Sequence, residues 1–279
     1  MHQRHVVTRL AAVAALASAL PVHAQQVDSA ASPWTVFGAQ RFWFATQSVK
    51  VLDAGLSVPG TAAAPVLQTR LAEITSSNVV PITALGVRYG KALATVSVLP
   101  STGFDSGGLM GGSQIRRQEF DLSVGYQALP ATTVSLIYKR GKASPTITQA
   151  ARDLLGLSEG EGSGNAVLLG LSTSAALQGA LSLYANLAYG GGRWTAVDIP
   201  GQSNRYPSRY TVADFGLAWR AGGPANVTLQ LGYRTQTLTL KRVDLPVYSL
   251  DAPPQLLASP RVNAPSTTQG VVLSVGAAF

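Results

Sequence analysis

Apolar and polar residues alternate one by one along several segments of this chain. The clearest segment covers residues 119–127, where every second side chain is large and apolar and the side chains between are polar or small. The same alternation returns at 181–189, 211–220, 227–234 and 271–279. Successive side chains of a β-strand point to opposite faces, so this period of two predicts strands with one apolar face and one polar face.

Weaker alternation fills the spaces between these segments. It covers residues 34–47, 79–89, 92–99, 132–140 and 165–174. Together the segments predict about ten strands, each near the ~10 residues that a tilted membrane-crossing strand requires. Counts of eight or twelve strands stay open, because the first strand and the connection after it are the least regular.

Short and long connections follow one another strictly along the chain. The short connections are residues 90–91, 129–131, 176–179 and 221–225; the long ones are 48–78, 100–116, 141–163, 190–208 and 241–266. An up-and-down barrel whose chain ends both lie in the periplasm produces this order, with tight turns at one end and long external loops at the other. The sequence therefore predicts an all-β fold: a closed, antiparallel transmembrane β-barrel.

Aromatic residues fall near both ends of the expected strands. Tyr89, Tyr126, Trp219 and Phe279 lie near the short turns, and Phe120, Tyr138 and Tyr189 lie near the long loops. Amphipathic rings are favoured at the headgroup level of a bilayer, so two aromatic belts are expected of a barrel that spans a membrane.

The N-terminal residues have the plan of a secretory signal. Arg4 and Arg9 supply positive charge, an apolar stretch follows over residues 10–22, and Val22-His23-Ala24 offers small residues at a cleavage site. The apolar stretch is shorter than the ~20 residues of a spanning helix. We therefore expect a signal peptide over residues 1–24, a short periplasmic segment over 25–33 and one barrel domain over 34–279.

Removal of the signal changes the chemistry that the chain can offer. All three histidines, His2, His5 and His23, lie within it, and the chain has no cysteine. The remaining 19 basic and 13 acidic residues give a net charge of +6, which is compatible with an anionic partner such as lipopolysaccharide phosphates. Disulfides and thiolate metal sites are excluded, and we expect no metal, no cofactor and no nucleic-acid partner.

The C-terminal segment carries a resemblance to a known class. Apolar residues stand at alternate positions before a final aromatic residue: Val271, Leu273, Val275, Ala277 and Phe279. This pattern resembles the last strand of bacterial outer-membrane β-barrel proteins. The resemblance implies an outer-membrane location, periplasmic chaperones as partners, and recognition of the strand by the barrel assembly machinery. It also implies that the last strand closes the barrel against the first.

An enzymatic role is disfavoured by the same inventory. Resemblance to omptin-type proteases would require an Asp–His arrangement, and outer-membrane lipid A deacylases and phospholipases use Ser–His chemistry. A mature chain without histidine lacks that general base. The carboxylate pair Glu119 and Asp121 lies on one face of one strand, and we interpret it as part of a charge cluster in the lumen.

Two sets of residues remain as candidate sites. The polar strand faces would direct six charged side chains into the lumen: Arg88, Glu119, Asp121, Lys139, Asp214 and Arg234. They would form either the lining of a narrow passive pore for ions or small solutes, or a salt-bridged plug in a structural, non-conducting barrel. The second set is basic and aromatic and is expected in a loop that binds lipopolysaccharide or an acidic glycan, as in an adhesin: Arg193, Trp194, Arg205, Tyr206 and Arg209.

Overall fold

The structure is a computed structural model that describes most of the expected barrel domain. The described residues are 34–49, 74–105, 114–146, 161–199, 202–221, 226–244, 247–248, 256–258 and 261–279. The expected signal peptide (1–24) and periplasmic segment (25–33) lie outside the described residues.

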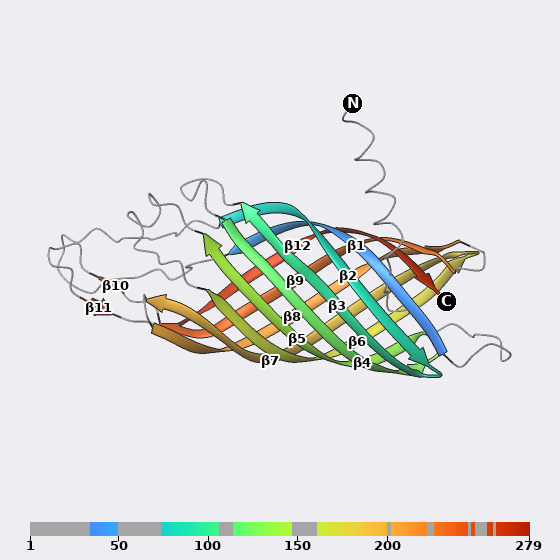
Figure 1. Ribbon diagram of the computed structural model, residues 1–279, viewed down its shortest axis with the longest axis horizontal. Helices are drawn as coiled ribbons and strands as arrows, with labels where there is room; N and C mark the ends of the chain where they lie inside the picture. Colours follow the sequence, from blue (N-terminus) through green and yellow to red (C-terminus); the bar gives the residue numbers. More distant parts are fainter. Residues whose placement is uncertain are drawn as a thin grey trace, which may run out of the picture.

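Ten long strands form one closed antiparallel barrel (Figure 1). They are β1 (Trp34–Val49), β2 (Ile74–Tyr89), β3 (Ala92–Asp105), β4 (Gln114–Leu129), β5 (Thr132–Thr146), β6 (Gly162–Gln178), β7 (Leu181–Ile199), β8 (Gln202–Arg220), β9 (Thr228–Asp244) and β12 (Arg261–Ala278). Two short strands, β10 (Val247–Tyr248) and β11 (Leu256–Ala258), pair with each other in a separate sheet. Each long strand pairs with its neighbours in sequence, so the predicted up-and-down barrel of ten strands is confirmed.

The first and last long strands close the barrel against each other. Strand β1 pairs with β2 on one side and with β12 on the other. The backbones of Val36 and Phe279 exchange two hydrogen bonds, of 3.0 and 2.8 Å between nitrogen and oxygen. The ten-stranded sheet therefore has no open edge, and every strand has a backbone partner on each side.

The strands are longer than the alternation predicted. They run for 14 to 19 residues, and β7 and β8 are the longest. Most of the predicted loop 190–208 is therefore strand, and that expectation was wrong. The alternation continues there, but its inward positions carry Gly190, Gly192 and Trp194, which do not look like the polar side of a strand.

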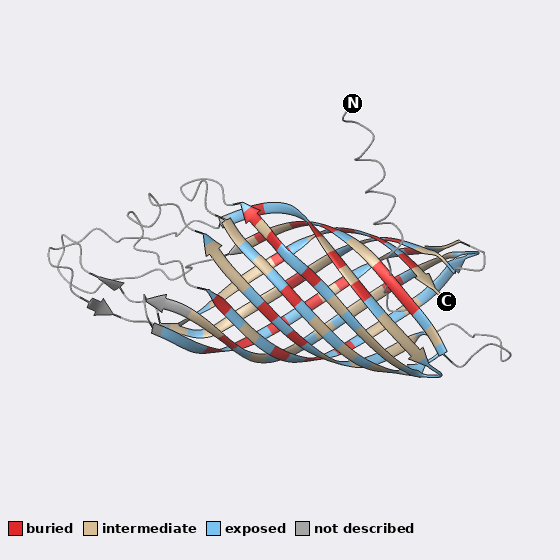
Figure 2. Ribbon diagram, in the orientation of Figure 1, coloured by how far each residue is buried: buried red, intermediate tan, exposed pale blue. Residues whose placement is uncertain are grey.

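The two faces of most strands differ in exposure, so buried or half-buried residues alternate with exposed ones (Figure 2). On β6, Leu168 is buried in the lumen, while Leu169 beside it is 68% exposed on the outer surface. On β7, Leu183 is 45% exposed, whereas Asn186 lines a cavity in the lumen. None of the described residues belongs to a helix with the length and apolarity that a membrane span requires.

The lumen is less uniformly polar than the alternation suggested. Buried apolar residues occupy three clusters inside it: Trp43, Ala45, Val80, Ile82, Leu99, Phe104 and Val272; Ala166, Leu168, Trp194 and Tyr210; and Phe37 with Ala84. Strand β1 shows why its pattern was irregular. Phe37 and Trp43 point inward, whereas Phe42 and Phe44 are on the outer surface, so both faces are aromatic.

Candidate functional site

The inward faces bring five of the six predicted lumen residues into two polar clusters. Glu119, Asp121 and Lys139 belong to one cluster, and Asp214 and Arg234 belong to the other. Each cluster borders an apolar one, since Lys139 Nζ lies 5.9 Å from the centroid of the Tyr210 ring and Arg234 Cζ lies 5.3 Å from that of the Trp43 ring. Register explains the grouping, because Asp121 pairs with Lys139 on the neighbouring strand and Asp214 pairs with Arg234.

The first cluster, here called the loop-side cluster, consists of Arg117, Glu119, Asp121, Lys139 and Gln236. Lys139 is only 1% exposed, and its Nζ donates to Glu119 Oε2 at 2.6 Å and to Asp121 Oδ2 at 3.0 Å. Arg117 also forms an ion pair with Glu119. Two cations thus face two carboxylates, so the buried charges of this cluster balance.

The loop-side cluster bridges opposite walls of the barrel. Gln236 Nε2, on β9, donates to the two carboxylate oxygens of Glu119, on β4, at 2.9 and 3.1 Å. In the strand order of the closed sheet, four strands separate β4 from β9 in either direction. A second bridge joins Arg117 Nη1 to Thr268 Oγ1 of β12 at 2.5 Å. Hydrogen-bonded side chains therefore cross the lumen from wall to wall.

The second cluster, here called the turn-side cluster, consists of Arg41, Tyr184, Asp214 and Arg234. Asp214 Oδ2 lies 3.4 Å from Arg41 Nη1 and 3.6 Å from Arg234 Nη1, and its Oδ1 accepts from the Tyr184 hydroxyl at 3.0 Å. Arg234 Nη2 donates to Gln236 Oε1 at 3.5 Å, which links the two clusters. Since β9 runs from the short turns to the long loops, this cluster is the nearer one to the short turns.

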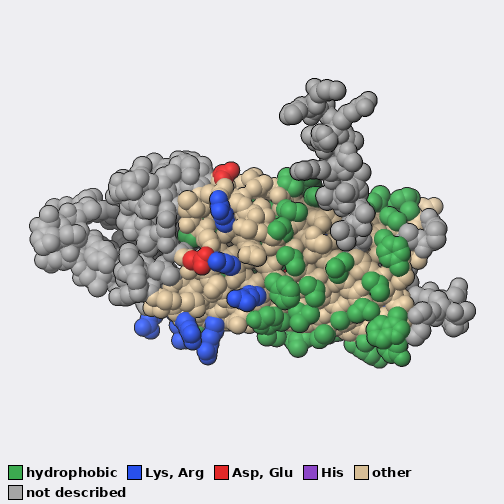
Figure 3. All heavy atoms as spheres, viewed as in Figure 1, with side chains coloured by type: hydrophobic (Ala, Val, Ile, Leu, Met, Phe, Trp, Pro, Cys, Tyr) green, Lys and Arg blue, Asp and Glu red, His purple; other side chains and the backbone are tan. Residues whose placement is uncertain are grey.

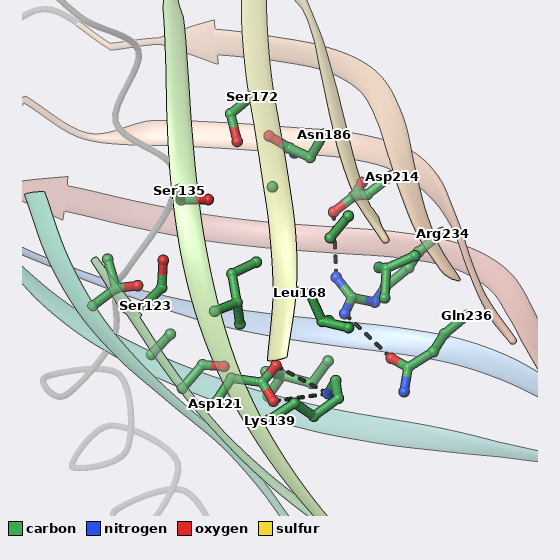
Figure 4. A pocket seen from close by; sticks show the side chains of 18 of the residues that line it. Asp121, Ser123, Ser135, Lys139, Leu168, Ser172, Asn186, Asp214, Arg234 and Gln236 are labelled. Carbon is green, nitrogen blue, oxygen red and sulfur yellow. Dashed lines mark hydrogen bonds and ion pairs between the residues drawn. The ribbon is translucent and has the colours of Figure 1, made fainter. Parts of the chain in front are cut away.

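A cavity of about 180 Å³ lies between the two clusters and the wall opposite (Figure 4). Its charged lining residues are Arg41, Glu119, Asp121, Lys139, Asp214 and Arg234. The remaining lining is rich in uncharged polar side chains: Thr95, Ser97, Ser123, Thr133, Ser135, Ser172 and Asn186. The described part of the lumen thus holds a small space whose lining mixes charged, uncharged polar and apolar side chains.

Arg88, the sixth predicted lumen residue, lies apart from both clusters. It is near the short turn that ends β2, where its Nε donates to the Gly90 carbonyl oxygen at 2.8 Å and its Nη2 donates to Gln127. Its partners are thus local to the short-turn end of the barrel.

The second predicted set does not form one surface. Trp194 and Tyr206 are 7% and 6% exposed and point into the lumen, so we correct the expectation that they contribute to an external binding loop. Arg193, Arg205 and Arg209 are exposed on the outer wall. Parity decides the split: these residues lie on β7 and β8, where neighbouring positions face opposite sides.

Exposed basic residues form a group on the outer wall, here called the arginine girdle. It consists of Arg116, Arg140, Arg193, Arg205 and Arg209 on strands β4, β5, β7 and β8. Arg140 and Arg193 are both register partners of Asn165 on β6, so they flank one residue. Figure 3 shows basic side chains between the apolar part of the wall and the loop end. The girdle lies on the loop side of Phe120, Tyr138 and Tyr189.

A local ion pair lies close to this girdle. Lys142 Nζ is 2.5 Å from Glu161 Oε1, and the Ser144 hydroxyl donates to the same carboxylate at 3.0 Å. These hydrogen bonds favour the ionised form, so they lower the pKa of Glu161. Within the described ranges, no group of three or more acidic, histidine or cysteine side chains is arranged to hold a metal ion.

Sequence reasoning missed several members of these sites. Arg41 and Gln236 have the inward parity of their strands, but neither belongs to a pattern that stands out locally. Arg140 lies two residues after Tyr138 on the same face, which was a usable signal for the girdle. The cross-lumen partners Gln236 and Thr268 are far from Glu119 and Arg117 in sequence, and no local pattern connects them.

Comparison with known proteins gives a likeness of fold alone. No protein-family model matches the sequence, and no curated protein is significantly similar to it.

Several solved structures share the fold. The outer membrane protease OmpT from Escherichia coli is 10% identical in sequence and has a TM-score of 0.42; the match covers 88% of this chain and 96% of the OmpT chain. The translocator domain of the autotransporter NalP from Neisseria meningitidis is 12% identical, with a TM-score of 0.38, over 99% and 95%. A FadL homologue from Pseudomonas aeruginosa is 11% identical, with a TM-score of 0.34, over 88% and 90%. All three are bacterial outer-membrane barrels, the class that the C-terminal pattern resembles.

Proposed function

We propose that this chain is an integral protein of the bacterial outer membrane whose lumen is closed and whose outer wall binds lipopolysaccharide. The proposal combines three features of the described barrel: an apolar outer band, side chains that cross the lumen, and the arginine girdle. Each feature supports a different part of the proposal.

The apolar outer band supports insertion into a bilayer. The outward positions between the two aromatic belts carry large apolar side chains that are exposed, such as Leu122, Val124, Leu136, Leu171 and Leu217. A soluble protein rarely exposes a continuous apolar surface of this extent. A closed barrel satisfies its backbone hydrogen bonds internally, so such a surface is stable against lipid tails.

The observation that carries the closed lumen is the pair of hydrogen bonds between Gln236 and Glu119. Side chains from opposite walls meet there, and Lys139 and Arg117 anchor the same carboxylate. A ten-stranded barrel is only slightly wider than one that side chains fill completely. The charged layer and the apolar clusters around it therefore favour a plug over a water-filled passage.

The arginine girdle supports contact with lipopolysaccharide. Guanidinium groups bind phosphate through paired hydrogen bonds, and an arginine just beyond the apolar band lies at headgroup height. Arg209 also stacks over the ring of Tyr189, with its Cζ 5.5 Å from the ring centroid. This contact holds a cation directly above the loop-side aromatic belt.

Single-channel recording in a planar bilayer tests the closed lumen. The refolded wild-type chain should insert without steady conductance in sodium or potassium chloride, and protease protection and heat-dependent gel mobility should confirm its insertion. The double substitution Q236A/E119A should introduce ion-conducting events, because it removes the wall-to-wall bridge. Steady current through the wild-type chain would overturn the closed lumen and would support a narrow passive pore.

A further inference from the structure

The turn-side cluster holds more positive charge than it neutralises. Arg41 and Arg234 share one carboxylate, that of Asp214, and both contacts are long, at 3.4 and 3.6 Å. Tyr184 donates to the same carboxylate and supplies no negative charge. The loop-side cluster, by contrast, pairs two cations with two carboxylates. A buried cation without a full partner is costly, so the turn-side cluster lacks one anion.

Unpartnered donors around this cluster point to the same deficit. Arg41 Nε, Arg234 Nε and Trp43 Nε1 are buried, and none of the three has a hydrogen-bond partner among the described residues. Trp43 is fully buried, and its ring lies 5.3 Å from Arg234 Cζ. Three donors in one neighbourhood without acceptors indicate a site that is built to receive oxygen lone pairs.

All three of these side chains line the cavity of about 180 Å³. The uncharged polar residues Ser135, Ser172 and Asn186 line the same space and could complete the coordination of a ligand. Asn186 is the register partner of Asp214, so its amide lies beside the cationic centre. Cationic donors, neutral hydrogen-bonding groups and empty volume thus occur together.

We propose that this cavity binds one small monovalent anion, a carboxylate or an oxyanion, between Arg41 and Arg234. One negative charge brings the turn-side cluster to neutrality. The carboxylate of Asp214 disfavours anions of higher charge, and the cavity volume limits the ligand to a few heavy atoms. The site is independent of the proposed function, because the cross-lumen bridge of the loop-side cluster does not need an anion.

Isothermal titration calorimetry on the refolded full chain in detergent tests the site, at constant sodium concentration and ionic strength. Sodium acetate and sodium nitrate should each bind with saturation at one site. Sodium lactobionate has the same carboxylate chemistry on a disaccharide that is too large for the cavity, and it should give no saturable heat. Absence of saturable binding by both small anions would overturn the proposal.

Variants separate the site from general electrostatic attraction. R41Q should weaken acetate binding by about tenfold or more, the effect of losing one charge-assisted hydrogen bond. D214N should strengthen it, because it removes the competing negative charge while it keeps the shape of the side chain. R88Q removes a lumenal arginine outside the cavity and should leave the affinity unchanged.

Equal affinity in R41Q and R88Q, or weaker binding in D214N, would overturn the proposal. Should R41Q fail to fold, R234Q provides a second loss of cation, and it should weaken acetate binding in the same way. The closed lumen is tested by conductance and the anion site by binding heat, so either proposal can fail alone.

Discussion

Gln236 and Glu119 lie 117 positions apart in sequence and on opposite walls of the barrel, yet they are joined by two hydrogen bonds of 2.9 and 3.1 Å. The contact shows how the lumen of this barrel is organised. Carboxylate and amide meet across the lumen because both side chains point inward, and the bore is narrow enough for two side chains to span it. The consequences of this arrangement can be measured.

Substitution of Glu119 by Gln should destabilise the barrel strongly. The change leaves Lys139 and Arg117 without their shared carboxylate in a buried site, and breaking such a pair costs about 3–5 kcal/mol. The free energy of unfolding by urea in lipid vesicles measures the loss. E161Q is the matched control, because its pair with Lys142 is exposed; a comparable loss in both variants would contradict the importance of burial.

Gly162 and Trp194 should behave as a coupled pair. A Cβ built at Gly162 would lie 2.6 Å from Trp194 Nε1, so G162A should force the indole to shift and cost about 1–3 kcal/mol. In a W194A background the same substitution should be almost neutral, because the three atoms nearest to that Cβ all belong to the removed ring. A double-mutant cycle in urea measures the coupling. Additive effects would show that Trp194 does not occupy this position.

A charge placed on the outer wall should act according to its depth. Val124 lies between Phe120 and Tyr126 on the outer face of β4, so V124R should cost about 2–4 kcal/mol in a bilayer. Gln118 is exposed on the same face but lies beyond Phe120, so Q118R should change stability by less than about 1 kcal/mol. Urea unfolding in vesicles measures both. Equal costs would place Val124 outside the apolar band.

Removal of girdle arginines should weaken binding of lipopolysaccharide. R140Q/R193Q removes two cations that flank Asn165, and binding to phosphorylated lipopolysaccharide should fall because two charge-assisted phosphate contacts are lost. Surface plasmon resonance on immobilised lipopolysaccharide measures the change. K91Q/R220Q removes the same charge at the short-turn end and should have little effect. If both double variants bind equally, or if dephosphorylated lipopolysaccharide binds as well, the girdle is not a phosphate site.

Phe279 should matter for assembly more than for stability. Its side chain is 76% exposed, while its backbone closes the barrel through Val36, so F279A keeps the closing hydrogen bonds. We expect spontaneous refolding into vesicles to proceed as in the wild type and folding in the presence of the assembly machinery to slow. Refolding assays with and without the reconstituted machinery measure the difference. Equal slowing in both assays would assign Phe279 a structural role instead.

The alternation of single residues predicted the strands, their number and their order, because a strand has only two faces and each faces a different medium. It also placed Glu119, Lys139 and Asp214 in the lumen, since a charge on the outer face of a membrane barrel is costly. It failed at the loop ends of β7 and β8. There the inward positions hold Gly192 and Trp194, and the ring of Trp194 fills the space that Gly141 and Gly162 leave on strands β5 and β6.

Where the alternation is clear, the chain by itself determined which face a side chain occupies, because that follows from parity along one strand. Only the closed structure decided which side chains meet. Contacts such as Gln236 with Glu119, or Arg41 with Asp214, depend on the strand register around the whole barrel and on the width of its bore. The excess cation of the turn-side cluster is likewise a property of three-dimensional neighbours, since Arg41, Asp214 and Arg234 come from different strands.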